Sequence, residues 1–318
     1  MPRIDLLTAG EAFQDLIFVG LPHMPRDGEE LRIARFAATI GGGAVITATA
    51  AARLGLRTAI VSALSAEAAA TLRADRVQVV NVKRPSEAHA VSVALSTRRD
   101  RSFVTFNGVN DLLEARLPVP ITRHRARHVH FAFAPRQCAR WIRIADRLRR
   151  RGVTTSWDFG WNPPLRQAAG FDALVASADF VFVNEKEADL YARRRGAAAV
   201  TFWRRTARHT IIKLGPRGSR WISGARQAAG TSSHGDIAVP APRVRVVDTT
   251  GAGDAFNGGF LTAWLNGQRP RECLRLGNFV GSQSTLAAGG IASLPVAEPL
   301  TAAGASAGLK ACATRERT

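Results

Sequence analysis

Cysteine is scarce in this sequence of 318 residues, and the three that occur, Cys138, Cys273 and Cys312, are scattered. Their odd number and their spacing give neither a disulfide framework nor a zinc pattern. No run of about 18 uninterrupted apolar residues occurs, so no segment is expected to span a bilayer. The first residues carry Asp5 within their apolar stretch and lack the long apolar core of a signal peptide. We therefore expect isolated thiols and a cytoplasmic location.

Two common phosphate-binding patterns are also missing. No G-x-x-x-x-G-K-[ST] occurs, which argues against a P-loop kinase. The Gly-Ala-Gly-Asp stretch at Gly251–Asp254 comes late in the chain and lacks G-x-G-x-x-G spacing. It also has no acidic residue about twenty positions on in a following strand. The sequence therefore disfavours a dinucleotide-dependent dehydrogenase.

Acidic residues are few, 25 against 44 Lys and Arg, which leaves a formal charge of +19. Such an excess is typical of nucleic-acid binders. Almost all of these basic residues are Arg, however, and they are dispersed. Runs such as Arg149–Arg151 and Arg193–Arg195 stand just before a glycine near expected helix C-termini, where positive charge complements the helix dipole. We therefore expect a solvated basic surface rather than a nucleic-acid partner.

From about residue 120 onward, short apolar runs alternate with helical stretches, which predicts βαβ units. Expected strands are 128–133, 153–159, 180–183, 211–214 and 244–247; expected helices are 137–151, 171–178, 185–195 and 252–266. His128 and His130 share one face of the first of these strands, and we expect a structural role for them rather than a metal site. The sequence therefore predicts a mostly parallel α/β sheet.

The N-terminal third has four short strand candidates, 16–19, 30–36, 90–95 and 102–106, and a helix of small residues at 44–54. No helix separates the members of each strand pair, which predicts a small β-sheet added to the main domain and drawn from about 12–36 and 88–110. We expect residues 1–300 to form one domain and residues 301–318 to be a loosely ordered tail.

The segment Val246–Phe260 is the most informative for chemistry. Its pattern predicts a strand, a glycine-rich loop and then a helix, so that backbone N–H groups and the positive end of the helix converge. Asp254 falls in the first helical turn, where it could accept a hydroxyl proton while the amides hold a phosphoryl group. The alternative is that the glycines serve a tight turn and Asp254 caps the helix.

This segment resembles the C-terminal signature of the ribokinase-like, or PfkB, family of sugar and nucleoside kinases. Three further segments are similar to other motifs of that family: Gly41–Gly43 with Ala50–Gly55, Asn184–Glu187 (N-x-x-E), and Lys213–Gly218 (a nucleotide-side G-x-x-G turn). The resemblance implies a doubly wound α/β body with a small β lid. It also implies transfer of the γ-phosphoryl group of ATP, with Mg²⁺, to a hydroxymethyl group.

The resemblance also implies roles for individual residues. Asp254 matches the catalytic base, and the amides of Gly251, Ala252 and Gly253 match the anion hole. Asn184 and Glu187 match positions that organise Mg²⁺ and phosphate through water. The nucleotide side comprises Lys213, Gly215, Gly218, Thr249 and Asn278, and the substrate side Asp15, Gly41 and Gly42.

Other candidates follow from their places in the expected elements. Asp158, Asn184, Gly215 and Asp248 each follow the last apolar residues of an expected parallel strand, the rim where ligands bind in open α/β sheets. Asp158 with Asn162 is equally well explained as a turn or a helix cap. Arg101, Asn107 and Asn110, in or after a lid strand, either reach the substrate or are exposed strand and turn residues.

Two departures from the family pattern leave the substrate open. Ile46 stands where the family usually has an Asn that binds sugar hydroxyls, and the G-x-D-x-x-G after the second main strand is replaced by Ser62–Glu67. We expect a carbohydrate kinase. A nucleoside kinase of the same fold, favoured if Ile46 enlarges the pocket, and a catalytically idle descendant that binds nucleic acid are the alternatives. A monovalent cation near Asp248 and a homodimer through the lid stay open.

Overall fold

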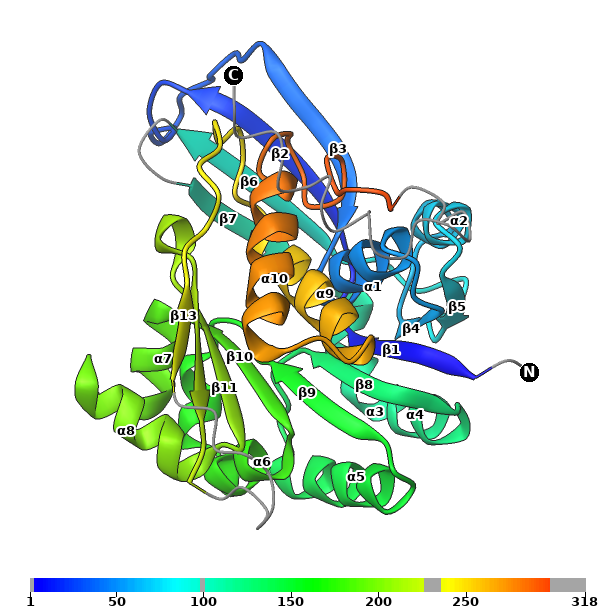
Figure 1. The fold of residues 1–318 in the computed structure, drawn as a ribbon. Coiled ribbons are helices and arrows are strands. Elements are labelled where there is room, and N and C mark those ends of the chain that lie inside the picture. Colours follow the sequence, from blue (N-terminus) through cyan, green and yellow to red (C-terminus); the bar gives the residue numbers. More distant parts are fainter. Residues whose placement is uncertain (1–2, 98–100, 226–235, 298–318) are drawn as a thin grey trace, which may run out of the picture.

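The large sheet of this computed structural model, which describes residues 3–97, 101–225 and 236–297, has nine strands (Figure 1). The expected tail, 301–318, lies outside the described residues. In spatial order the strands are β13 (Ile237–Val239), β12 (Ser219–Ser223), β11 (His209–Lys213), β10 (Phe180–Asn184), β9 (Thr154–Asp158), β8 (Ala126–Ala132), β1 (Ile4–Gly10), β4 (Thr58–Ser62) and β5 (Gln78–Asn81). From β11 to β5 all neighbours are parallel, and only β12 and β13 pair antiparallel.

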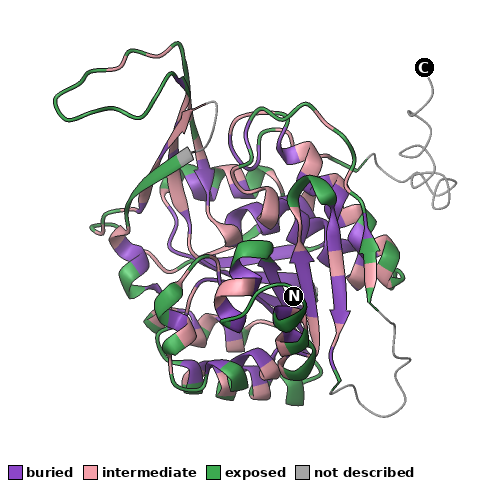
Figure 2. Ribbon diagram, turned by 90° about the vertical axis from the view of Figure 1, so that its left-hand side faces the viewer, coloured by how far each residue is buried: buried purple, intermediate pink, exposed green. Residues whose placement is uncertain are grey.

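Helices cover both faces of this sheet because alternate strand residues point to opposite sides. Leu7 and Val181 pack with the first group of helices, α3 (Leu113–Arg116), α4 (Pro118–Arg123), α5 (Cys138–Arg150), α6 (Phe171–Ser177), α7 (Glu185–Ala192) and α8 (Ala197–Thr206). Leu6 and Phe182 pack on the other face, where α1 (Gly43–Arg53), α2 (Ala66–Ala74), α9 (Ala252–Leu265) and α10 (Pro270–Ser284) lie. Figure 2 shows the buried strands inside these layers. The expected doubly wound α/β sheet is confirmed.

The lid is a separate four-stranded sheet in the order β3 (Arg35–Gly41), β2 (Phe13–Leu21), β6 (Val91–Thr97) and β7 (Arg101–Phe106). It begins three residues after the end of β1, so it stands at the carboxyl ends of the parallel strands, above the main sheet in Figure 1. A short 3-10 helix, η1 (Gly108–Leu112), links β7 to α3. The expected lid is present.

Several local expectations are wrong. The strand expected at 30–36 begins only at Arg35 and runs to Gly41, because its register is set by pairing with the distant β2. The strand expected at 244–247 is irregular, with Val246 and Val247 about half exposed. It follows Pro240 and Pro242, which lack the N–H donors that a sheet edge needs. The helix expected at 185–195 ends at Ala192, and α8, β12 and β13 were not expected.

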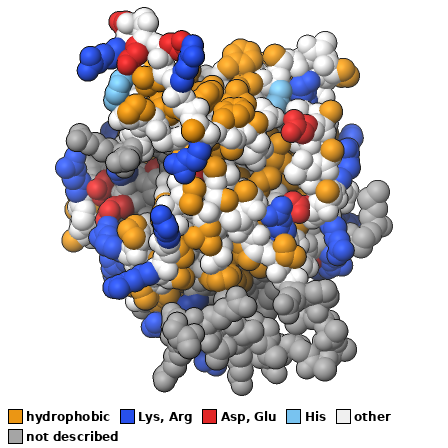
Figure 3. All heavy atoms as spheres, turned by 90° about the horizontal axis from the view of Figure 1, so that it is seen from above, with side chains coloured by type: hydrophobic (Ala, Val, Ile, Leu, Met, Phe, Trp, Pro, Cys, Tyr) orange, Lys and Arg blue, Asp and Glu red, His pale blue; other side chains and the backbone are white. Residues whose placement is uncertain are grey.

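The basic residues are dispersed over the face seen in Figure 3, with hydrophobic side chains exposed between them. His128 and His130 are fully buried and both bond the Ser156 hydroxyl oxygen, at 2.7 and 2.8 Å. Within the described residues no cluster of three or more His, Cys, Asp or Glu could hold a metal ion. No helix there has the length and apolar character needed to cross a bilayer.

Candidate active site

Asp254 lies in the first turn of α9, and its carboxyl faces the start of α1. Gly251, the N-cap, has the left-handed φ of 71° that glycine adopts without strain. A Cβ placed on Gly43 would lie 2.9 Å from Asp254 Oδ1, so the missing side chain lets α1 approach the carboxyl. The Thr47 hydroxyl donates to the Asp254 carbonyl at 3.0 Å and fixes the two helices together. Asp254 is only partly buried, so packing does not close it off.

The environment of Asp254 favours a carboxyl that changes protonation near neutrality. Burial raises its pKa to about 7, and the negative charge of Asp158 acts in the same direction. The ammonium of Lys213 opposes them, while Glu187 and Asp15 add further negative charge. A carboxylate with this pKa is a stronger proton acceptor than an ordinary aspartate and is still largely ionised just above neutral pH.

Backbone amides are available beside this carboxyl. Within the described residues no acceptor pairs with the N–H of Gly251 or Gly253, while the N–H of Ala252 reaches the Thr249 carbonyl at 3.3 Å. These groups stand at the positive end of the 14-residue helix α9. The loop and helix therefore place these amides at a helix N-terminus, and their role in binding an anion stays a prediction.

Asp248 fixes the loop that carries these amides. Its Oδ1 accepts from the N–H and the hydroxyl of Thr250, at 3.0 and 2.8 Å, and its Oδ2 accepts from the Gly289 N–H at 3.0 Å. The Val247 N–H donates to the Thr285 carbonyl at 2.8 Å, which holds the loop against the segment after α10. Asp248 was expected to follow a strand. The chain before it is irregular, so these hydrogen bonds, and not a preceding strand, hold Asp248 in place.

Ile46 lies beneath the anion-binding loop. It is only 2% exposed, and its Cδ1 fills the space next to Gly251 and Gly290, where a Cβ on either glycine would overlap it. Whether Ile46 enlarges a substrate pocket, which would favour a nucleoside kinase, stays open. Its methyl groups support the backbone of the anion-binding loop.

A buried polar network joins β9, β11 and α9 behind Asp254. Lys213 Nζ donates to Asp158 Oδ2 at 2.7 Å, and Asn257 Nδ2 donates to the same oxygen at 2.8 Å. Burial acts to raise the pKa of Asp158, but Lys213 and Asn257 outweigh it and hold the pKa below its usual value. Asp158 is thus part of the site. Asn257 was not predicted, although its position three residues after Asp254 places both on one helix face.

Asn184 and Glu187 form a capping box at the start of α7. The Glu187 N–H donates to Asn184 Oδ1 at 2.9 Å, and the Asn184 N–H donates to Glu187 Oε2 at 2.8 Å. Burial, with the charge of Asp158, raises the pKa of Glu187 to about 7. The second carboxylate oxygen, Oε1, accepts no bond within the described residues, so contact with a metal through water suits this pair.

The residues expected on the nucleotide side lie along the turn after β11 and in α10. Gly215, with a φ of 60°, begins the 3-10 turn η3 (Gly215–Arg217), and Gly218, with a φ of 96°, follows it. Asn278 Nδ2 donates to the carbonyls of Val239 and Pro240, at 3.0 and 3.2 Å, so it ties α10 to the end of β13. Thr249 is exposed beside the anion-binding loop.

The residues expected on the substrate side belong to the lid strands or follow them. Asp15 lies in β2, Gly41 ends β3, and Gly42 follows it. Asp15 is 7% exposed, and its carboxyl packs so closely on Gly41 that a Cβ there would overlap it. Burial, with the charge of Asp248, raises the pKa of Asp15 to about 7. A Cβ on Gly42 would in turn overlap the Glu11 carbonyl. The side chain of Arg101 lies outside the described residues.

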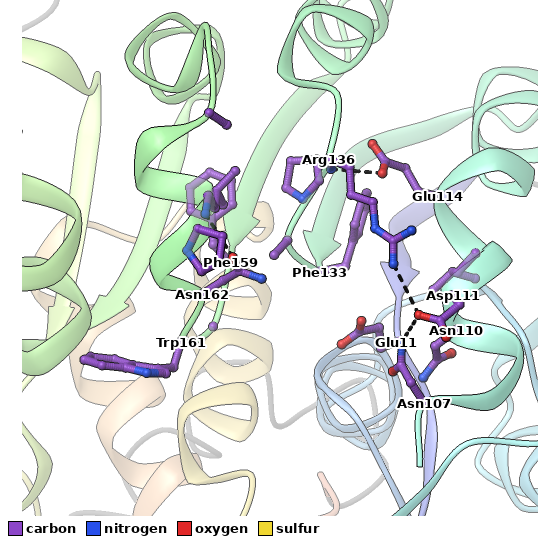
Figure 4. A pocket seen from close by; sticks show the side chains of 17 residues that line it. Glu11, Asn107, Asn110, Asp111, Glu114, Phe133, Arg136, Phe159, Trp161 and Asn162 are labelled. Carbon is purple, nitrogen blue, oxygen red and sulfur yellow. Dashed lines mark hydrogen bonds and ion pairs between the residues drawn. The ribbon is translucent and has the colours of Figure 1, made fainter. Parts of the chain in front are cut away.

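A cavity of about 520 Å³ opens beside this region (Figure 4). Residues that line it include Asn107 and Asn110 after β7, Arg136 after β8, and Trp161 and Asn162 after β9. Asn107 Nδ2 donates to Asp111 Oδ1 at 2.6 Å, and Asn162 caps the 3-10 helix η2 (Pro163–Gln167) through its bond to the Leu165 N–H. The structure thus brings Asn107 and Asn110 to a cavity, and Asn162 acts as a helix cap at its edge.

Comparison with known proteins is consistent with this geometry. The family profile described as pfkB family carbohydrate kinase matches residues 3–297. A ribokinase of Arabidopsis thaliana is 26% identical over 314 residues, 91% of this chain and 78% of its own. A nucleoside kinase of Methanothermobacter thermautotrophicus is 24% identical over 286 residues, 87% and 88% of the two chains. The solved structure of adenosine kinase from Sinorhizobium meliloti superposes with a TM-score of 0.74 at 23% identity, over 91% and 96% of the chains.

Proposed function

Because the chain belongs to the pfkB family of carbohydrate kinases, we propose that it transfers the γ-phosphoryl group of ATP to a hydroxyl group of a sugar or sugar-like substrate. Asp254 accepts the hydroxyl proton as the oxygen attacks the γ-phosphorus, the bond to the bridging oxygen breaks, and ADP leaves. The single observation that carries this proposal is the placement of Asp254 beside the unpaired amides of Gly251 and Gly253 at the start of α9.

The loop 251–253 supports the anion-hole part of the proposal. Its amides and the dipole of α9 stabilise the charge that builds on the transferring phosphoryl oxygens. A preorganised donor of this kind contributes about 3–4 kcal/mol to the transition state in a well-studied hydrolase. Ile46 beneath the loop and Asp248 behind it keep these donors in place before the nucleotide arrives.

Lys213 supplies positive charge next to the anion hole. A Cβ on Gly253 would lie 3.0 Å from Lys213 Nζ, so the ammonium stands directly beneath the loop. Burial acts to lower its pKa, but the charges of Asp158, Glu187 and Asp254 outweigh this and raise it, which keeps the group charged. On this proposal the nucleotide lies along Gly215, Gly218 and Thr249, with the base next to α10 near Asn278.

Magnesium would be held through water by Glu187, with Asn184 fixing the orientation of that carboxylate. When bound, Mg²⁺ neutralises charge on the nucleotide phosphates. The free Glu187 Oε1 fits this role, since a reluctantly dehydrated ion keeps several waters.

The acceptor would lie between the lid and Asp254. Asp15, held against Gly41, and the backbone at Gly42 offer hydrogen-bond acceptors and donors for its hydroxyl groups. Asn107 reaches this region from the lid side, and Arg101 belongs to the same proposal on the strength of its place in β7.

Two further parts of the proposal concern a cation and a partner. A monovalent cation near Asp248 would tie the anion-binding loop to the segment at Gly289, and turnover in potassium against choline chloride would test it. The lid presents Phe36 and Phe106, each 57% exposed, which supports a homodimer formed through the lid. Sedimentation of the wild type and of Phe106→Asp would test that interface.

A panel assay of ADP release tests the function directly. Turnover with sugars alone supports the carbohydrate kinase, and turnover with adenosine or guanosine alone supports the nucleoside kinase instead. Relatives of both kinds match this chain, which keeps the second candidate in the panel. Absence of turnover with every hydroxyl compound, together with salt-sensitive DNA binding, would point to an idle binding protein and contradict both.

A further inference from the structure

The cavity of about 520 Å³ differs in charge from the rest of the molecule. Three carboxyl groups line it, those of Glu11, Asp111 and Glu114, against the one guanidinium of Arg136, and no Lys or His is among the lining residues. The chain as a whole carries a formal charge of +19. The cavity is therefore an acidic site in a basic protein, of a size typical for small-molecule pockets.

Two of these carboxylates are already engaged by the protein. Glu114 accepts from the N–H groups of Arg136 and Gln137, at 2.9 and 3.1 Å, and from Trp141 Nε1 at 2.8 Å. Asp111 Oδ1 accepts from Arg136 Nη2 at 3.2 Å and from Asn107 Nδ2 at 2.6 Å. The contacts of Glu114 position the start of α5. The guanidinium of Arg136, the one cationic group among the lining residues, is paired with Asp111.

Glu11 is the carboxylate that the protein leaves without a donor. Within the described residues no hydrogen bond or ion pair reaches it, and Figure 4 shows it between the group around Arg136 and the loop with Phe159 and Asn162. Burial raises its pKa to about 7, with Asp111 adding to the rise and Arg136 opposing it. A donor-bearing cation would satisfy this group and keep it ionised.

Asn110 is a second, independent acceptor at the same place. It is 6% exposed, and its Nδ2 donates to the Ala12 carbonyl at 3.1 Å, next in sequence to Glu11. Its Oδ1 has no hydrogen-bond partner within the described residues. Buried polar atoms are rarely left without a hydrogen-bond partner, because the hydration that they lose on burial is then not replaced. A donor entering beside Glu11 would supply the missing bond.

Aromatic rings complete the wall. Phe133 and Phe159 are buried at 5% and 4% exposure, whereas Trp161 is 61% exposed. Figure 4 shows the indole of Trp161 pointing away from Glu11 and Asn110, so the rings of Phe133 and Phe159 form the aromatic part of the wall. Carboxylate and aromatic faces together are the surroundings that favour an ammonium group, through charge and cation–π attraction. They disfavour a phosphate or a carboxylate.

The cavity adjoins the place where the acceptor hydroxyl must stand. Glu11 donates its N–H to the Ala132 carbonyl at 3.2 Å. A Cβ on Gly43 would lie 3.0 Å from the Ala132 side chain and 2.9 Å from Asp254 Oδ1. Ala132 therefore contacts the backbone of Glu11 through its carbonyl, and its methyl group faces the start of α1 beside Asp254.

We propose that this cavity is a subsite for a primary ammonium group on the phosphoryl acceptor, bound by Glu11 and Asn110. The substrate class is then an amino sugar or an amino-substituted sugar derivative. The inference rests on the proposed kinase function, in that the same molecule offers its hydroxyl to Asp254.

Calorimetric binding of matched sugars tests the subsite without requiring turnover. Each set holds a sugar with a primary amine, the same sugar with a hydroxyl at that carbon, and its N-acetyl derivative. We expect the amine to bind wild-type protein at least about tenfold more tightly than its hydroxyl partner, about 1.4 kcal/mol. Glu11→Gln should abolish that preference. Glu67→Gln, the same change at an exposed residue of α2, should keep it.

A second measurement guards against misfolding of Glu11→Gln. The hydroxyl sugar of each set should bind Glu11→Gln as tightly as it binds wild-type protein, so that only the preference for the amine is lost. Equal binding of amine and hydroxyl sugars by the wild type, or absence of binding by any set, overturns the subsite. ADP release with hydroxyl sugars would leave the kinase proposal standing in that case. Amine-selective binding without ADP release against any acceptor would support the proposed subsite and contradict the proposed kinase function.

Discussion

The ammonium of Lys213 and the carboxylate of Asp158 lie 2.7 Å apart beneath the first turn of α9, with only 13% and 9% of their side chains exposed. Lys213 ends β11 and Asp158 ends β9, two strands that are separated by β10. Asn257 of α9 donates a hydrogen bond to the same Asp158 oxygen. The pair therefore connects the carboxyl rim of the sheet to the helix that carries Asp254. It also places a fixed positive charge next to the expected path of the phosphoryl group.

We predict that Lys213→Met lowers the free energy of unfolding by about 3–5 kcal/mol, because it leaves Asp158 buried without its cation. Adding Asp158→Asn should recover part of that loss, and urea unfolding of the four proteins of the cycle measures the coupling. Lys186→Met, an exposed lysine of α7, is the matched control and should change little. If the losses of the two single variants add up to the loss of the double variant, the pair is not coupled.

We predict that Asp254→Asn lowers kcat by about 10²- to 10⁴-fold, the usual contribution of a positioned general base. Binding of ATP should change little, since the amides of the loop are untouched. Steady-state kinetics and direct nucleotide titration separate the two effects. Asp27→Asn, an exposed aspartate between β2 and β3, should behave as wild type. Near-normal turnover in Asp254→Asn would remove the residue from the base role.

The pH dependence of activity should follow the Asp254 carboxyl, whose pKa burial raises to about 7. Only the ionised form accepts a proton, so kcat/KM should fall as pH drops below about 7 and level off above it. Lys213 holds this pKa down, so Lys213→Met should move the acidic limb to higher pH. A limb that stays in place in that variant would contradict the electrostatic link between the two groups.

Stability should depend on pH in the opposite sense to that of most proteins. Asp15, Glu187 and Asp254 each have a folded pKa of about 7, against ordinary values of 3.8, 4.5 and 3.8. Between about pH 4 and pH 7 the native state therefore holds more protons than the unfolded chain. The contribution of these groups to the free energy of unfolding should therefore rise as pH falls through that window.

Urea unfolding at several pH values measures this slope. Asp254→Asn removes one of the contributing carboxyls, so its slope should be smaller by up to about one proton. Asp27→Asn should leave the slope as in wild type. A wild-type slope of the opposite sign would mean that the ionised, ion-paired carboxylates elsewhere, such as Asp5 with Arg57, outweigh the carboxyls whose pKa burial raises, Glu11 among them.

The sequence could predict those parts of the site whose residues lie close together along the chain, and not those whose residues are far apart in it. Asp254 with the loop 251–253, and Asn184 with Glu187, each lie within a few residues, so spacing alone places them together. Asp158 and Lys213 are 55 positions apart, and Asp158 and Asn257 are 99 apart. Only the strand order brings them to one point, so the network could not be read from local pattern.

The fold divides in the same way. The parallel strands expected at 128–133, 153–159, 180–183 and 211–214 follow from apolar runs of the expected length, and the structure confirms them, whereas the strand expected at 244–247 is absent. The antiparallel edge, β12 and β13, has no connecting helix to announce it, and β3 takes its register from the distant β2. The orientation of Ile46 is also a tertiary outcome. Its position in a helix of small residues does not say that its Cδ1 fills the space beside two glycines.

The contact between Ile46 and Gly251 gives the last prediction. Gly251→Ala should destabilise the fold for two reasons: the φ of 71° strains an alanine by about 1–3 kcal/mol, and the new methyl group overlaps Ile46 Cδ1. Ile46→Ala removes the overlap and leaves the backbone strain. The double variant should therefore be more stable than the sum of the two single effects predicts.

Gly28→Ala isolates the backbone part of this effect. Gly28 has a similar φ of 78°, with nothing within 4 Å of an added Cβ, so it should show the strain without the overlap. Turnover should fall in Gly251→Ala as its amide leaves the anion-binding position, and should recover in part with Ile46→Ala. If the two substitutions combine additively in stability and in turnover, Ile46 does not support the loop, and the anion hole owes its shape to Asp248 alone.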